Sequence, residues 1–164
     1  MPAKMHSFYL RNMYLQNKLR EPGGIALAGV PINLSKVQIP LYFVSTFEDH
    51  ISPWQSTYAG AKLFPGPVRF VLGGSGHIAG IINPPGAGKY YYWTRDRLDA
   101  DPQQWLAQAK QQAGSWWPDW AAWVAHYAGE PVPARSPGAG HLPALEDAPG
   151  AYVKMRFDAL PPQR

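Results

Sequence analysis

Two apolar runs separated by a segment with helical character restrict the folds open to this chain. The runs are residues 39–46 (IPLYFVST) and 68–72 (VRFVL), and neither alternates apolar with polar side chains. Such runs are typical of strands buried on both faces, as in parallel sheets. Between them, residues 53–63 can form a helix with Pro53 in its first turn. Strand, helix and strand in this order predict a βαβ unit with parallel strands.

Start and stop signals predict further helices. They span residues 7–19, 101–112 and 118–129, with Ser7 and Asp101 as the N-caps of the first two. Residues 25–34 are predicted to be extended or looping. The sequence Asn-Pro-Pro-Gly at 83–86 is predicted to stop regular structure after the second strand.

Glycine and proline indicate long loops. The 16 Gly and 18 Pro make up about a fifth of the 164 residues, against a usual ~12 %. They are dense in residues 130–147, which are predicted to form a loose loop. Two strands do not make a stable sheet, because their edges and apolar faces stay uncovered. The α/β chain, residues 1–164, is therefore predicted to be the end of a larger sheet.

Composition excludes several classes of function. The net charge is +4, but the 15 Lys and Arg are scattered, so no nucleic-acid partner is predicted. The absence of cysteine excludes disulfides, thiolate metal sites and a cysteine nucleophile within these residues. His6, His126 and His141 lack ligand-like spacing, so neither metal nor cofactor is predicted. No apolar run reaches the ~18 residues of a transmembrane segment, and no signal peptide is apparent, which indicates the cytoplasm.

An acid and a histidine follow the two predicted strands. Asp49 lies in FEDHISPW after the first, and His77 lies in GGSGHIAG after the second. Functional groups of parallel sheets lie just past the carboxyl ends of the strands, so we expect both at one sheet edge. A carboxylate there can accept the imidazole Nδ1–H and leave Nε2 free as a base. Acid before histidine is also the order in α/β-hydrolases.

Each residue also has a structural interpretation. Asp49 could cap the helix that begins near Pro53, and His77 could be an ordinary loop residue. His50, adjacent to Asp49, could be a second polar contact.

Two glycine patterns around the histidine are weaker. The segment 73–77 resembles a nucleophile elbow, but G-x-S-x-G needs glycine where His77 stands. Residues 74–79 match G-x-G-x-x-A, yet the prolines at 84 and 85 forbid the long helix that a dinucleotide site needs.

An aromatic stripe is expected on the last predicted helix. It is most simply a packing face, with a ligand platform as the alternative, and it consists of Trp116, Trp117, Trp120, Trp123 and Tyr127.

Taken together, these motifs resemble a known family. The chain is similar to the C-terminal part of class I polyhydroxyalkanoate synthases, also called poly(3-hydroxybutyrate) polymerases. The resemblance covers nearly the whole chain except the first few residues and 130–147. It is carried above all by EDHI (48–51), GHIAG (76–80) and SWWPDW (115–120), with HSFYLRNMYLQNKL (6–19), YYWT (91–94) and APGAYVK (148–154) in support.

The resemblance implies an α/β-hydrolase-like catalytic domain with a Cys–His–Asp triad. The thiolate would attack the thioester of an (R)-3-hydroxyacyl-CoA, release CoA and add the acyl group to a polyester chain. His77 would be the general base and Asp49 the acid, with His50 assisting and Trp54 in support. It also implies the polyester granule surface and a homodimer as partners.

The family's nucleophile lies in a G-x-C-x-G elbow upstream of these motifs, and this chain has no cysteine. The N-terminal half of the sheet is likewise expected to be absent, through a truncated gene, a split gene or a misplaced start. The resemblance therefore predicts a chain that is inactive alone. Two alternatives are an interaction module that complements an N-terminal half or binds granules, and a hydrolase that uses Ser52 or Ser75.

Overall fold

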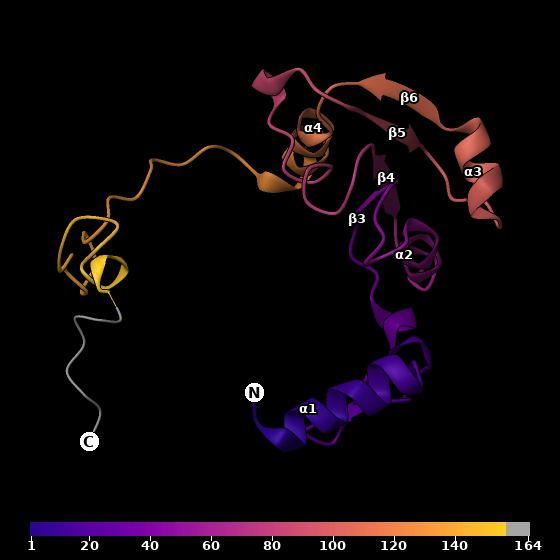
Figure 1. Ribbon diagram of the computed structural model, residues 1–164, viewed down its shortest axis with the longest axis horizontal. Coiled ribbons are helices and arrows are strands. Elements are labelled where there is room, and N and C mark those ends of the chain that lie inside the picture. Colours follow the sequence, from indigo (N-terminus) through magenta and orange to yellow (C-terminus); the bar gives the residue numbers. More distant parts are fainter. Residues whose placement is uncertain (157–164) are drawn as a thin grey trace. The chain divides into compact units, whose positions relative to one another are not determined.

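A mixed four-stranded sheet is the centre of the first of two units, residues 1–127 and 128–164 (Figure 1). The computed structural model describes residues 1–156. The sheet order is β3-β4-β5-β6, in which β3–β4 is a parallel pair and the other pairs are antiparallel. The strands are β3 (Leu41–Thr46), β4 (Val68–Gly73), β5 (Tyr91–Arg95) and β6 (Lys110–Ala113). The α/β class predicted from the sequence is confirmed.

The predicted βαβ unit is present. Helix α2 (Trp54–Ala61) connects β3 to β4, and the two strands pair in register from Leu41 opposite Val68 to Thr46 opposite Gly73. Pro53 is the N-cap of α2 and not part of its first turn. In both strands the carboxyl-terminal residues are the most buried, so the loops that follow β3 and β4 start from fixed points in the unit.

The hydrophobic core lies between one face of the sheet and helices α2 and α3 (Pro102–Gln108). Because side chains alternate along a strand, Phe70 and Leu72 of β4 face this core together. Phe70 packs against Tyr58 of α2 and Trp105 of α3, with ring centroids 5.0 and 5.2 Å apart. Trp105 is fully buried, and its large apolar surface joins the two helices to the sheet.

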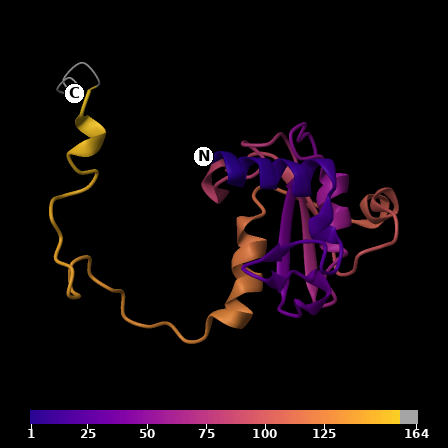
Figure 2. The ribbon, with the colours of Figure 1, turned by 90° about the horizontal axis from the view of Figure 1, so that it is seen from below.

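Helix α4 (Trp117–Ala128) covers the opposite face of the sheet. Figure 2 shows α4, in orange, on the other side of the strands from α3. It contacts Tyr42 and Arg69, which precede the core-facing Phe43 and Phe70 by one position in β3 and β4. The predicted helix 118–129 is confirmed to within a residue.

The first helix differs from its prediction at both ends. It begins at Ala3 as α1 (Ala3–Tyr9) and continues as the π-helix η1 (Leu10–Leu15), so Ser7 lies inside it and is not the N-cap. Ala3, Lys4 and Met5 are good helix formers, which extends the helix before Ser7. Asn17, in the left-handed region with φ 48°, ends it before the 3-10 turn η2 (Lys18–Arg20).

The stretch 25–34 is extended, as predicted. Its strands β1 (Ala26–Leu27) and β2 (Val30–Pro31) pair as a hairpin, and the 3-10 turn η3 (Leu34–Lys36) leads to β3.

Two strands were not predicted. After the 3-10 turn η4 (Pro85–Ala87), β5 pairs with β4, and β6 pairs with β5. The prediction of a helix to residue 112 is therefore wrong. Asp101 caps α3 as expected, through bonds from the N–H groups of Gln103 and Gln104, but α3 ends at Gln108. Ala109 has an extended backbone, and the next four residues pair with the free edge of β5 as β6.

The second unit has little regular structure in its described part. Residues 129–151 contain neither helix nor strand, and the 3-10 turn η5 (Tyr152–Lys154) follows. The loose loop over 130–147 stays a prediction.

Candidate active site

The loops after β3 and β4 continue the pairing of their strands. Beyond Thr46 and Gly73, the last ladder pair, the Phe47 N–H donates to the Gly73 carbonyl at 2.8 Å. The Glu48 N–H then donates to the carbonyl of Ser75 at 3.0 Å. These two bonds hold the loops side by side past the sheet edge, where the next residues are those predicted to meet.

Asp49 and His77 are in direct contact. Asp49 Oδ2 lies 2.8 Å from His77 Nδ1, although 28 residues separate them in sequence. The Asp49 side chain is 7 % exposed and that of His77 is 46 % exposed. The acid is therefore fixed in the protein, while the imidazole reaches solvent.

Asp49 does not cap α2, whose N-cap Pro53 has no side-chain cap bond, but it does hold the turn that precedes this helix. Its second oxygen, Oδ1, accepts bonds from the N–H groups of Ile51 at 2.9 Å and Ser52 at 2.8 Å, just before α2. One carboxylate thus bonds to this turn through Oδ1 and to His77 through Oδ2. The turn fixes the carboxylate, and the carboxylate orients the imidazole.

These contacts keep Asp49 ionised. The N–H of Ser52 is the largest cause, followed by His77 and then Ile51, and together they lower the Asp49 pKa from 3.8 to about 2. An ionised carboxylate only accepts hydrogen bonds, so a neutral His77 must carry its proton on Nδ1. Its Nε2 then has a free lone pair, and no other residue within 1–156 hydrogen-bonds to this ring. This arrangement can take up a proton at Nε2.

His77 opens a single helical turn. Gly80 N–H donates to the Gly76 carbonyl at 2.9 Å, and Ile82 N–H donates to the Ile78 carbonyl at 2.8 Å. The turn ends at Asn83, so the long helix of a dinucleotide site does not follow this loop.

The other residues considered from the sequence lie nearby without joining the pair. His50 is exposed, and among residues 1–156 it makes neither a hydrogen bond nor an ion pair. The side-chain oxygens of Ser52 and Ser75 make no hydrogen bond to His77 in the same range. Ser75 acts through its carbonyl, which accepts from Glu48, and its φ is 70°.

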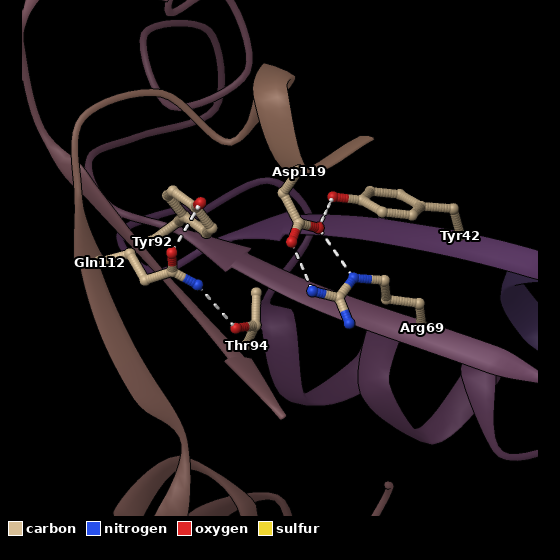
Figure 3. Close-up of polar contacts among 6 residues, drawn as sticks. All are labelled: Tyr42, Arg69, Tyr92, Thr94, Gln112 and Asp119. Atoms are coloured by element: carbon tan, nitrogen blue, oxygen red, sulfur yellow. Dashed lines mark hydrogen bonds and ion pairs between the residues drawn. The ribbon is translucent and has the colours of Figure 1, made fainter. Parts of the chain in front are cut away.

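A polar cluster on the α4 face of the sheet was not predicted (Figure 3). Asp119 of α4 accepts from Arg69 of β4 through both of its oxygens and from the Tyr42 hydroxyl of β3 at 2.7 Å. Burial would raise the Asp119 pKa, but the bonds from Arg69 and Tyr42 prevail and lower it. Burial and the neighbouring carboxylate raise the Tyr42 pKa. The cluster attaches α4 to β3 and β4, the strands whose following loops carry Asp49 and His77.

The described residues hold neither a metal-binding cluster nor a membrane-spanning helix. Within residues 1–156, no group of three or more His, Cys, Asp or Glu side chains is placed to hold a metal ion. In the same range, no helix combines the length and the apolar character needed to cross a bilayer.

Comparison with known proteins gives close relatives. No family model matches the chain. It is 51 % identical over 156 residues to the poly(3-hydroxyalkanoate) polymerase subunit PhaC of Rhizobium meliloti, which is 95 % of this chain and 25 % of that protein. It is 48 % identical over 158 residues to the subunit of the same name from Cupriavidus necator, covering 27 % of it.

A less similar relative is matched over a segment of nearly the same length. The chain is 43 % identical over 157 residues to poly(3-hydroxyalkanoate) polymerase 2 of Ectopseudomonas oleovorans, of which it covers 28 %. The chain therefore spans about a quarter of the length of the curated relatives that it matches.

Proposed function

Because the chain is homologous over nearly its whole length to poly(3-hydroxyalkanoate) polymerases, we propose that it supplies the base and the acid of a Cys–His–Asp triad. The observation that carries this proposal is the 2.8 Å contact between Asp49 and His77 Nδ1, which leaves Nε2 free and exposed. The thiol comes from polypeptide outside these 164 residues, since they contain no cysteine.

In the proposed reaction, His77 Nε2 takes the proton of the cysteine thiol. The thiolate attacks the thioester carbon of a 3-hydroxyacyl-CoA, the bond to CoA sulfur breaks, and the proton passes to the leaving CoA thiolate. The acyl group is then on the cysteine. The terminal hydroxyl of the polyester attacks this new thioester, gives up its proton to Nε2, and forms an ester bond as the cysteine leaves.

The α/β-hydrolase-like fold belongs to this proposal. Two features support it: a parallel strand pair joined by a helix, and an acid and a histidine past the carboxyl ends of those strands, in that order. The chain acts where the polyester is made, in the cytoplasm or at the granule surface.

The test is a chimera of the Cupriavidus necator polymerase in which the segment that matches this chain is replaced by it. We expect the chimera to release CoA from 3-hydroxybutyryl-CoA and to form polyester. His77→Ala should abolish both, and His141→Ala, on an exposed residue of the second unit, should change them little. A folded chimera whose activity survives His77→Ala would contradict the proposed base.

The chain alone is proposed to be inactive. With the acid and base in place but no thiol, CoA release by the purified chain should equal that of its His77→Ala variant. Turnover well above that variant would contradict this, and labelling by a serine-reactive phosphonate would then indicate a hydrolase that uses Ser52 or Ser75.

A second candidate function is that of an interaction module. The helical segment 3–15 has no buried residue, and its exposed apolar side chains include Met5, Tyr14 and Leu15, at 58, 73 and 78 % exposure. Surfaces of this kind mark association sites. Co-expression with a cysteine-bearing N-terminal half from a relative tests it: failure to form a complex would contradict complementation.

A further inference from the structure

The turn that carries His77 needs support from outside itself. It contains one helical turn, and His77 begins it with a half-exposed side chain whose single hydrogen bond within residues 1–156 is to Asp49. A hydrogen bond between two side chains orients the imidazole only if both backbones are fixed. Asp49 is fixed by the bonds from the Ile51 and Ser52 N–H groups, whereas the turn of His77 requires other contacts.

Two indole groups hydrogen-bond to this turn from the start of α4, one from Trp117 in its first turn and one from Trp116 just before it. Trp116 Nε1–H donates to the Gly80 carbonyl at 3.1 Å, and Trp117 Nε1–H donates to the Ile81 carbonyl at 3.0 Å. Each bond spans 36 residues of sequence. Gly80 is buried, so its carbonyl would lose its partner without gaining water if the first indole were absent.

Both tryptophans are themselves held by the sheet and the helix start. The Trp117 backbone N–H donates to the Ser115 hydroxyl at 3.1 Å. The Trp116 ring lies 6.2 Å from that of Tyr42, whose hydroxyl donates to Asp119 in the cluster of Figure 3. A continuous set of contacts therefore leads from β3 and β4 through α4 to the His77 turn.

The turn also abuts the end of β3. A Cβ atom on Gly80 would lie 2.3 Å from Thr46 Cγ2 and 2.5 Å from the Gly74 carbonyl oxygen. The turn thus contacts Thr46 as well as the two indoles, and it has little room to shift relative to Asp49.

We propose that Trp116 and Trp117 are positioning residues for His77, which act through the hydrogen bonds of their indoles to Gly80 and Ile81. The expected effect of these residues on catalysis rests on the proposed function, whereas their effect on the orientation of the His77 imidazole does not. Two members of the predicted aromatic stripe thus orient His77 through hydrogen bonds in addition to packing.

The direct test is ¹⁵N NMR of the histidine-labelled chain, in which His77 is assigned by the signal lost in His77→Gln. In the unsubstituted chain, neutral His77 should be protonated at Nδ1. In Trp116→Phe/Trp117→Phe, which keeps the aromatic bulk and removes both donors, the His77 signals should show a loss of the Nδ1-protonated tautomer in favour of the Nε2-protonated one. Trp120→Phe is the matched control, since Trp120 is 45 % exposed and its indole makes no hydrogen bond within residues 1–156.

Unchanged His77 signals in a folded double variant would overturn the proposal. If the double variant does not fold, the single Trp117→Phe variant decides in the same way, because the Ile81 carbonyl keeps its bond from the Asn83 N–H at 3.1 Å and the variant can fold. In the active chimera, the double variant should lose roughly ten- to a hundredfold in kcat with little change in KM. An inactive chimera would contradict the proposed function and leave the NMR result standing.

Discussion

At the residue scale, Asp49 is the side chain on which most depends. Its Oδ2 bonds to His77 and its Oδ1 bonds to two backbone N–H groups, so it links the candidate site to the turn that precedes α2. The hydrogen bonds that lower its pKa to about 2 also couple folding to pH.

We predict that Asp49→Asn lowers the free energy of unfolding at neutral pH and that the deficit disappears in acid. A carboxyl group with a lowered pKa stabilises the fold above its unfolded value, near 3.8, and loses this contribution as the pH falls to about 2. Urea unfolding of both proteins between these pH values and neutrality measures the deficit. A deficit of the same size at every pH would show that the charge of Asp49 is not its source.

The same substitution tests the tautomer of His77. An asparagine amide can donate to Nδ1, which would place the imidazole proton on Nε2 and remove the free base. The His77 ¹⁵N signals should therefore report the opposite tautomer in Asp49→Asn. Retention of the proton on Nδ1 would contradict the orientation proposed here.

Sequence reasoning at this scale found the pair but not its support. Asp49 and His77 could be predicted because each follows a buried run, and parallel strands bring their carboxyl ends together. The indole bonds of Trp116 and Trp117 could not, because periodicity shows which face a side chain occupies but not where its N–H points. The contacts of Asp119 had only a weak signal in the sequence. Tyr42 and Arg69 can be placed side by side on one face of the sheet only once the register of β3 against β4 is known.

At the element scale, the His77 turn depends on a glycine at position 80. We predict that Gly80→Ala destabilises the chain by about 1–3 kcal/mol, the usual cost of overpacking, since the new methyl would overlap Thr46 Cγ2 and the Gly74 carbonyl. Thermal unfolding measures the loss. Gly86→Ala is the control, because a Cβ there meets no atom within 4 Å. Equal stability of the two variants would contradict this confinement of the turn.

The attachment of α4 depends on Asp119. We predict that Asp119→Asn costs about 2–3 kcal/mol of unfolding free energy, because it leaves the partly buried Arg69 guanidinium without its charged partner. Tyr42→Phe removes only one hydrogen bond to the same carboxylate and should cost about 1 kcal/mol. Denaturant unfolding ranks the two variants, and a larger loss for Tyr42→Phe would contradict the dominant role of the ion pair.

Elements with strong local signals were predictable and those defined by pairing were not. The apolar runs made β3 and β4 predictable, and Asp101 made the start of α3 predictable. The end of α3 was missed because residues 110–113 have no strand propensity, and they form β6 by pairing with β5. Tertiary pairing overrides propensity in such segments.

At the scale of the whole molecule, the chain has a core but leaves much apolar surface uncovered. One edge of β3 has no partner strand in the described part of the chain, and the segment 3–15 contributes nothing to the core. The relatives are about four times longer than the matched segment, and this uncovered surface is what a larger assembly would bury.

We predict that Met5→Lys/Leu15→Lys weakens association of this chain with the remainder of the Cupriavidus necator polymerase and leaves its own thermal stability unchanged. Both side chains are more than half exposed, so a charge costs nothing in the isolated chain but must be desolvated when the surface is covered. Leu145→Lys, on a side chain 96 % exposed in the second unit, is the matched control. Co-purification and thermal unfolding measure the two effects. If the double variant binds as well as the control, the helical segment 3–15 is not the contact, and the uncovered edge of β3 becomes the surface to test.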